Sequence, residues 1–137
     1  MKKMYKKAVV FLIYGIISGM FYHEVQYYSH FEGYSVLENV HTHTMVLGTV
    51  VFTLIPVFMK LFNVQDSKYF NKSIKFYESG LWLSTIMTTI IGLFQLYSMS
   101  MNKFFDHMTG GLDGIGHVLM AVGLYYMFKI LFEKAEN

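Results

Sequence analysis

The sequence predicts an all-α protein, an integral membrane four-helix bundle with both termini in the cytoplasm. Hydrophobic residues make up 54% of the 137 residues and charged residues only 15%, and the mean hydropathy is +0.38. Four apolar stretches are each about long enough to cross a hydrocarbon core of roughly 30 Å. An ordinary soluble domain is less apolar and more charged. We therefore expect residues 1–137 to form a single four-span domain whose solvent is the lipid bilayer.

The order of apolar and polar segments gives the expected spans. They cover about residues 8–28, 40–62, 76–101 and 112–132, and polar segments at 29–39, 63–75 and 102–111 separate them. Ten of the eleven lysines then fall on the side of the two termini, and only Lys103 falls on the other side. Under the positive-inside rule, this asymmetry predicts a multi-pass protein of the bacterial cytoplasmic membrane with both termini inside.

Two missing residue types narrow the function classes. The chain has no cysteine, which excludes disulfides, thiolate zinc sites, cysteine-ligated iron–sulfur clusters and covalent haem attachment. All eleven basic residues are lysines, so the chain has no bidentate arginine reader of bases, and we expect no nucleic-acid partner. Any metal must be held by histidine, carboxylate, methionine or tyrosine.

Histidines on three predicted spans reach a similar depth near the outer side. His23 lies 16 residues after Lys7, and His43 lies 17 residues before Lys60, which places both about 24–25 Å from the lysine side. His117 lies about one turn deeper. His41 precedes His43 by two residues, which are about 200° apart around a helix axis. Either these two histidines serve two centres, or His41 is a loop or cap residue.

The surroundings of these histidines favour haem over a bare metal ion. A neutral imidazole inside an apolar span needs a partner, because an unsatisfied polar group in hydrocarbon costs several kcal/mol. A porphyrin is a large apolar disc, which suits small and flexible residues beside its ligands. We expect haem b. The predicted metal ligands are four histidines, His23, His41, His43 and His117. We expect Gly48, Gly116, Met45 and Met120 around the ring and Lys103 at the propionates.

The segment His41-Thr42-His43-Thr44-Met45-Val46-Leu47-Gly48 resembles the His-x-His helix of haem-copper oxidase subunit I and related bacterial haem-containing membrane proteins. In that pattern, neighbouring histidines ligate metal centres from opposite helix faces. The resemblance implies that His41 and His43 are axial ligands, with His117 and His23 as their partners. It does not imply oxygen reduction, because the further histidines and tyrosine of an oxidase copper site have no counterpart. The whole chain also resembles a small bacterial family of four-span proteins of unassigned function.

A bis-histidine haem would make the protein an electron carrier or a redox or gas sensor with an unidentified redox partner, rather than a complete oxidase, because both axial positions are filled. One alternative is a non-haem zinc, copper or iron site made by the same histidines with nearby carboxylates. Another is a cofactor-free structural or small-solute membrane protein. The Gly15-x-x-x-Gly19 spacing is typical of close helix packing in membranes and predicts a homodimer.

Overall fold

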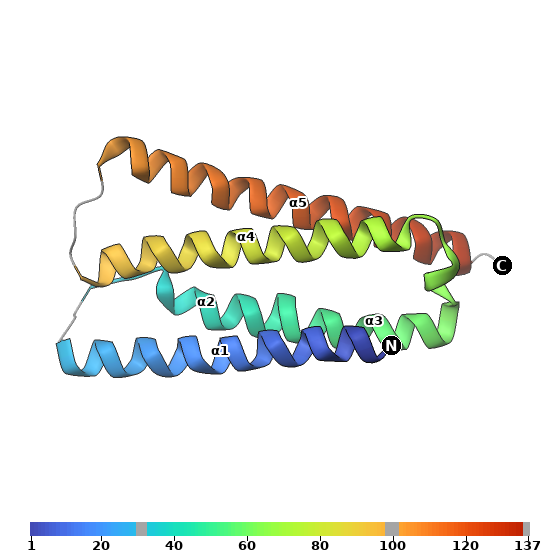
Figure 1. Cartoon of the computed structure of the whole chain (residues 1–137), viewed down its shortest axis with the longest axis horizontal. Coiled ribbons are helices and arrows are strands. Elements are labelled where there is room, and N and C mark those ends of the chain that lie inside the picture. The colour runs from blue at the N-terminus through green and yellow to red at the C-terminus, as the bar shows by residue number, and fades with distance from the viewer. Residues whose placement is uncertain (30–32, 98–101, 136–137) are drawn as a thin grey trace.

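The computed structural model contains four long helices, and it describes residues 1–29, 33–97 and 102–135. Helix α1 spans Lys2–Ser29. The second long helical segment is continuous but has three parts: α2 (Leu37–His43), the π-helix η1 (Thr44–Val50) and α3 (Val51–Phe62). After the short 3-10 helix η2 (Val64–Asp66), α4 spans Phe70–Leu96 and α5 spans Lys103–Ala135. The helices run up and down, and both termini lie at one end (Figure 1).

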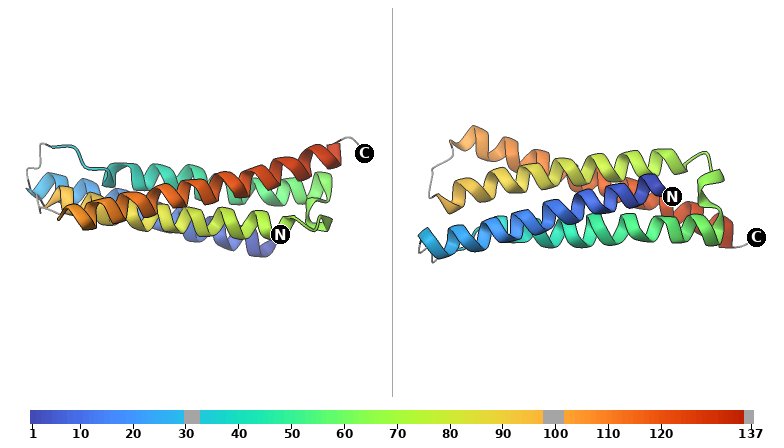
Figure 2. Two further views of the ribbon diagram at one scale, coloured as in Figure 1. Left: turned by 90° about the horizontal axis from the view of Figure 1, so that it is seen from above. Right: turned by 60° about the horizontal axis from the view of Figure 1, so that its bottom comes forward.

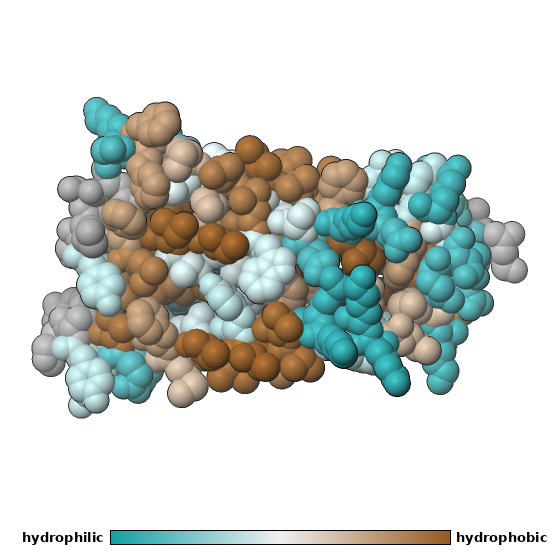
Figure 3. All heavy atoms as spheres, viewed as in Figure 1, coloured by the Kyte–Doolittle hydropathy of each residue, from teal (hydrophilic) through white to brown (hydrophobic). Residues whose placement is uncertain are grey.

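All four long helical segments of the described chain are long and apolar enough to cross a membrane: Lys2–Tyr28, Leu37–Phe62, Phe70–Leu96 and Lys103–Ala135. This confirms the prediction of an all-helical chain with four helices that are long and apolar enough to span a membrane. Figure 3 shows hydrophobic atoms over the middle of the bundle and hydrophilic atoms gathered toward the end that holds the termini. That distribution is typical of a helix bundle whose middle faces lipid.

The helix boundaries differ from the predicted spans mainly at three helix starts. The first helix begins at Lys2 instead of about residue 8. The third helix begins at Phe70 instead of about residue 76. The fourth begins at Lys103, so most of the predicted loop at 102–111 is helical. Asn102 explains this start, because its Oδ1 accepts a hydrogen bond from the Phe105 N–H at 2.7 Å, as a helix N-cap does. The predicted end of the third span at 98–101 lies outside the described residues.

Aromatic rings join α1, α3 and α4 at the core. Phe11 stacks on Phe52 with ring centroids 5.6 Å apart, and Trp82 lies 4.7 Å from Phe11. Gly48 in the π-helix makes room for this cluster, because a Cβ there would lie 2.5 Å from the Phe11 side chain. Tyr77 of α4 donates a hydrogen bond from its hydroxyl to the Leu47 carbonyl of η1 at 2.8 Å. The π-helix is therefore held from both α1 and α4.

Helices α4 and α5 pack most closely where two glycines meet. A Cβ on Gly80 would lie 2.5 Å from the Gly116 carbonyl oxygen, and one on Gly116 would lie 2.7 Å from the Ser84 nitrogen. Small residues at such crossings let membrane helices approach each other. The Lys103 end of α5 diverges from α4 beyond this point (Figures 1 and 2). The bundle therefore opens toward the end opposite the termini.

The predicted dimer face packs inside the chain. A Cβ on Gly15 would lie 2.8 Å from the Thr44 hydroxyl oxygen, and one on Gly19 would lie 3.4 Å from the His41 Cβ. Both glycines of α1 thus face the second long helical segment. The Gly-x-x-x-Gly spacing serves close helix packing as expected, but its partner is another helix of the same chain.

Candidate functional site

Two of the predicted ligand histidines lie next to each other between the second segment and α5. The ring centroids of His43 and His117 are 6.2 Å apart, and the ring planes are at 90°. His43 is the last residue of α2, directly before the π-helix, and His117 follows the close crossing of α4 and α5. The fold therefore brings together residues that are 74 positions apart in the sequence.

Both rings are oriented by the same kind of hydrogen bond. The Nδ1 of His43 lies 2.8 Å from the Asn39 carbonyl oxygen, and the Nδ1 of His117 lies 3.0 Å from the Asp113 carbonyl oxygen. A carbonyl oxygen only accepts, so in each case Nδ1 carries the proton and donates. In a neutral imidazole, this leaves the lone pair on Nε2. Metal-binding histidines are commonly held in this way by a backbone carbonyl at the other ring nitrogen.

A carboxylate stands behind the His117 ring. Asp113 Oδ1 lies 3.6 Å from His117 Nδ1 and accepts hydrogen bonds from the hydroxyls of Ser84 at 2.6 Å and Thr88 at 3.3 Å. Asp113 is ten residues from the start of α5, or about 15 Å along the axis. An acid in an apolar membrane helix is costly unless it is partnered. Here the two hydroxyls of α4 supply the partners.

His41 points away from this pair. Its side chain packs against Gly19 of α1, and its Nε2 lies 3.2 Å from the Thr42 hydroxyl. Its Nδ1 is buried and has no hydrogen-bond partner among the described residues. His41 and His43 thus face different neighbours, as two residues separated by about 200° should.

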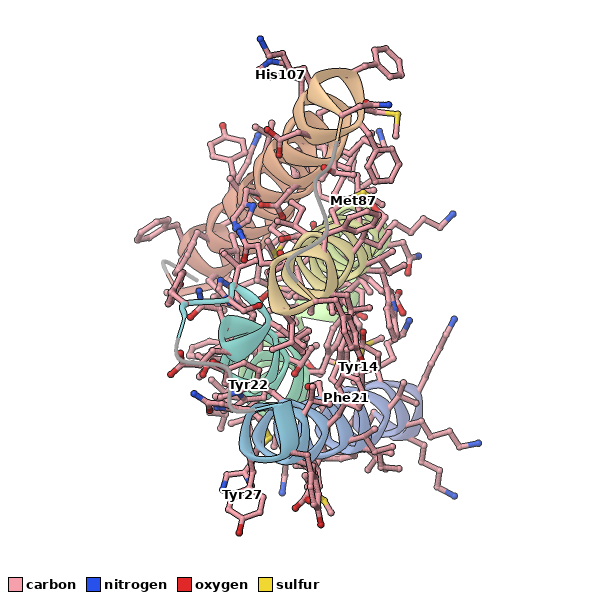
Figure 4. All side chains as sticks on the ribbon, turned by 90° about the vertical axis from the view of Figure 1, so that its left-hand side faces the viewer. Tyr14, Phe21, Tyr22, Tyr27, Met87 and His107 are labelled. Carbon is pink, nitrogen blue, oxygen red and sulfur yellow. The ribbon has the colours of Figure 1, made fainter. Side chains whose placement is uncertain are left out.

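The other histidines do not join the pair. The His23 side chain is 79% exposed and lies 3.8 Å from Glu24. His107 is exposed near the start of α5 and points away from the bundle (Figure 4). His30 lies outside the described residues. The structure therefore brings together His43 and His117 out of the four predicted ligands.

The remaining predicted site residues divide between the core and the surface. Gly48 and Gly116 serve helix packing against Phe11 and Ser84, and Met120 is buried in the core. Met45 lies beside Gly15 of α1. Lys103 is exposed at the start of α5, fourteen residues or about 21 Å before His117, which is farther than a haem edge reaches from its iron.

Three other glycines leave the surface of α5 bare near His117. A Cβ on Gly110, Gly111 or Gly114 would meet no atom within 4 Å among the described residues. At about 100° per residue, Gly110 and Gly114 lie within about 60° of His117 around the helix, whereas Gly111 lies about 120° away. The face of α5 that carries His117 is therefore open at Gly110 and Gly114, between the His117 ring and the Lys103 end of the helix.

A separate apolar cavity lies between the histidine pair and the end with the termini. It has a volume of about 200 Å³ and is lined by α3, α4 and α5, including Val51, Tyr77 and Leu124. Val51 follows His43 by eight residues and Leu124 follows His117 by seven, so the cavity begins about 10–12 Å from the pair along the helices. Figure 4 views the bundle end-on, with α1 and α5 at opposite edges and α2 and α4 between them.

The hydroxyl groups that donate hydrogen bonds to Asp113 were not predicted from the sequence. Ser84 and Thr88 are four residues apart in α4, so they share one face. That spacing was an available signal, because polar residues inside a span are expected to face a partner. Asn39 contributes only its carbonyl oxygen, and no sequence pattern indicates that role.

Comparison with known proteins places the chain in a family. The family model described as "Protein of unknown function (DUF2871)" matches residues 1–134. The chain belongs to this DUF2871 family. The prediction of a family of unassigned function is thus confirmed. No curated protein and no solved structure matches this DUF2871 chain, so these comparisons give the resemblance to haem-copper oxidases no support.

Proposed function

We propose that this DUF2871 protein binds one haem b between the second long helical segment and α5, with His43 and His117 as axial ligands. The observation that carries the proposal is the separation of the two rings. A metal–imidazole bond is about 2.0–2.1 Å long, so two imidazoles on opposite sides of one ion have ring centres about 6 Å apart. The two ring centroids lie 6.2 Å apart.

The number of ligands favours haem over a bare metal ion. In the described part of the chain, no group of three or more histidine or carboxylate side chains is placed to hold a metal ion. Structural and catalytic zinc sites take three or four protein ligands. Haem iron needs only two from the protein, because the porphyrin supplies the other four. Asp113 does not complete a bare-metal site, since its carboxylate lies near Nδ1 of His117 rather than near Nε2.

The surface around the pair suits a flat apolar ring. On α5, the bare face at Gly110 and Gly114 would let a porphyrin approach the helix backbone. A separate apolar cavity beside Val51 and Leu124 begins about 10–12 Å from the pair in the other direction. On the outer side, the side-chain amide of Asn39 donates a hydrogen bond to the Tyr34 hydroxyl at 2.9 Å. These two polar side chains would bind the haem propionates in place of Lys103.

Two histidine ligands fix the class of activity. With both axial positions filled, the iron has no open site for a substrate, so the haem would carry electrons or sense redox state; it would sense a gas only if one histidine left the iron. The carboxylate behind His117 would increase the basicity of that ligand and stabilise the oxidised iron. The protein would act in the bacterial cytoplasmic membrane, with its termini inside, together with a redox partner; whether two copies associate stays a prediction.

Replacement of each ligand tests the proposal. The variants His43→Ala and His117→Ala should each lose the sharp reduced α and β bands of a low-spin cytochrome. His107→Ala is the matched control, because this exposed histidine lies on the same helix as His117 and should leave the spectrum unchanged. Full low-spin haem in either ligand variant would contradict the assignment. Zinc, copper or iron bound without haem in the unaltered protein would favour the non-haem alternative.

A further inference from the structure

Two adjoining hollows lie on the surface of the bundle near the end that holds the termini. Their volumes are about 820 and 250 Å³, and both are lined by Glu78 and Trp82 of α4. The larger one extends along α4 toward Tyr126 of α5, and the smaller one extends toward α1. Together they form one continuous surface across three helices, which has no part in the proposed haem site.

The charges around these hollows are mostly positive. Five lysines and one glutamate line them. Lys7 forms an ion pair with Glu78, which neutralises one positive charge. The other four lysines have no opposite charge among the lining residues; they are Lys3, Lys6, Lys72 and Lys75. Such a cluster attracts an anion rather than a neutral ligand.

An apolar wall continues from the lysines into the membrane span. Phe76 and Trp82 line the larger hollow, and Val10 lines the smaller one. Trp82 follows Lys75 by seven residues, so it lies about 10 Å deeper along α4. Figure 3 shows hydrophilic atoms at this end giving way to the hydrophobic middle of the bundle. A free phosphate would use only the lysines, whereas a phospholipid would also use the apolar wall.

We infer that this surface binds an anionic phospholipid, with the headgroup phosphate at Lys72 and Lys75 and an acyl chain along Trp82. Basic hollows between transmembrane helices on the cytoplasmic side commonly take anionic headgroups. Each lysine near the membrane surface contributes about a fivefold preference for an anionic lipid. Several lysines over one acyl-chain wall therefore give a selective site.

The single tryptophan makes the site directly observable. Trp82 is the one tryptophan of the chain, so its fluorescence reports the lipid that contacts it. The protein is reconstituted into phosphatidylcholine vesicles that contain either brominated phosphatidylglycerol or brominated phosphatidylcholine. Bromine on the acyl chain quenches tryptophan on contact. Both lipids are tested with the same protein preparation. Any quenching of Trp82 by the protein itself is then equal in the two measurements and cancels when they are compared.

We expect brominated phosphatidylglycerol to quench Trp82 more strongly than brominated phosphatidylcholine. The double variant Lys72→Gln, Lys75→Gln should lower the relative association constant of phosphatidylglycerol by about tenfold or more. The matched control, Lys60→Gln, Lys68→Gln, removes the same charge from exposed positions outside both hollows and should keep the preference.

Three results would overturn the inference. Equal quenching of the unaltered protein by the two lipids would show that the surface does not select an anion. Equal losses in both double variants would indicate general surface attraction rather than a site. Removal of the preference by inorganic phosphate at constant ionic strength would show that the lysines take a free phosphate.

Discussion

The imidazole rings of His43 and His117 lie with their centroids 6.2 Å apart and their planes perpendicular. Each ring is held through Nδ1 by the carbonyl oxygen of the residue four positions earlier, Asn39 for His43 and Asp113 for His117. The same hydrogen bond on both rings sets the same neutral tautomer, with the proton on Nδ1 and the lone pair on Nε2. Our proposal places one metal centre between the two imidazoles.

Asp113 should tune the centre rather than hold it. In Asp113→Asn, the loss of a negative charge near His117 Nδ1 should raise the reduction potential by tens of millivolts, because the oxidised iron loses a stabilising charge; for one electron, about 59 mV corresponds to a tenfold change in the equilibrium constant. Potentiometric titration of the reduced α band measures this shift. Asp106→Asn, at an exposed position on the same helix, should leave the potential unchanged. An unchanged potential in Asp113→Asn would contradict the role of this carboxylate.

The bare face of α5 provides a test of where the ring lies. Gly114→Leu should reduce haem content sharply, because its side chain would occupy the face that carries His117, where an added Cβ would meet no atom of the described chain within 4 Å. Gly111→Leu is equally open but points about 120° away from His117, so haem content should stay normal. The pyridine haemochrome assay gives haem per chain for both variants. Equal haem content in the two variants would place the ring elsewhere.

The crossing of α4 and α5 should tolerate no added methyl group. In Gly80→Ala, the new Cβ would lie 2.5 Å from the Gly116 carbonyl oxygen, so the helices must separate. Overpacking of this kind costs about 1–3 kcal/mol and should lower the midpoint of unfolding. Gly111→Ala, where a Cβ meets nothing within 4 Å and which lies away from His117, should be neutral or stabilising by up to about 1 kcal/mol. Unfolding in detergent with increasing denaturant compares them, and equal midpoints would argue against a close crossing.

Cysteine labelling tests the predicted orientation. The chain has no cysteine, so a single introduced cysteine is unique. Lys103→Cys lies at the end of the bundle opposite the termini, and Gln65→Cys lies in η2 at the same end as the termini. A maleimide that cannot cross the membrane should label Lys103→Cys in intact cells and label Gln65→Cys only after lysis. The reverse pattern would place the termini outside.

Hydropathy predicted the four long apolar helices correctly because an apolar stretch of sufficient length satisfies its backbone hydrogen bonds most simply as a helix. It did not predict the start of α5, since the pair Gly110-Gly111 resembles a turn. The structure keeps these glycines helical in a helix that the Asn102 side chain begins. Local composition therefore indicated the spans better than their boundaries.

Prediction of the site depended on the rotation of each helix. His43 and His117 were both predicted as ligands, and the fold places them side by side. His23 was expected at the same layer, yet it is 79% exposed. Helix α1 has apolar residues on all sides of its axis, so no polar face in the sequence predicts how the helix is rotated about that axis. Depth along a helix could be counted from the sequence, whereas direction around the axis required the packed structure.

The most direct test of the central proposal is an absorption spectrum of the detergent-purified protein, oxidised and then reduced with dithionite, with haem counted per chain. Protein from haem-replete cells should show a Soret band and sharp reduced α and β bands, with one haem per chain. A featureless spectrum from the same cells would contradict the assignment of His43 and His117 as haem ligands.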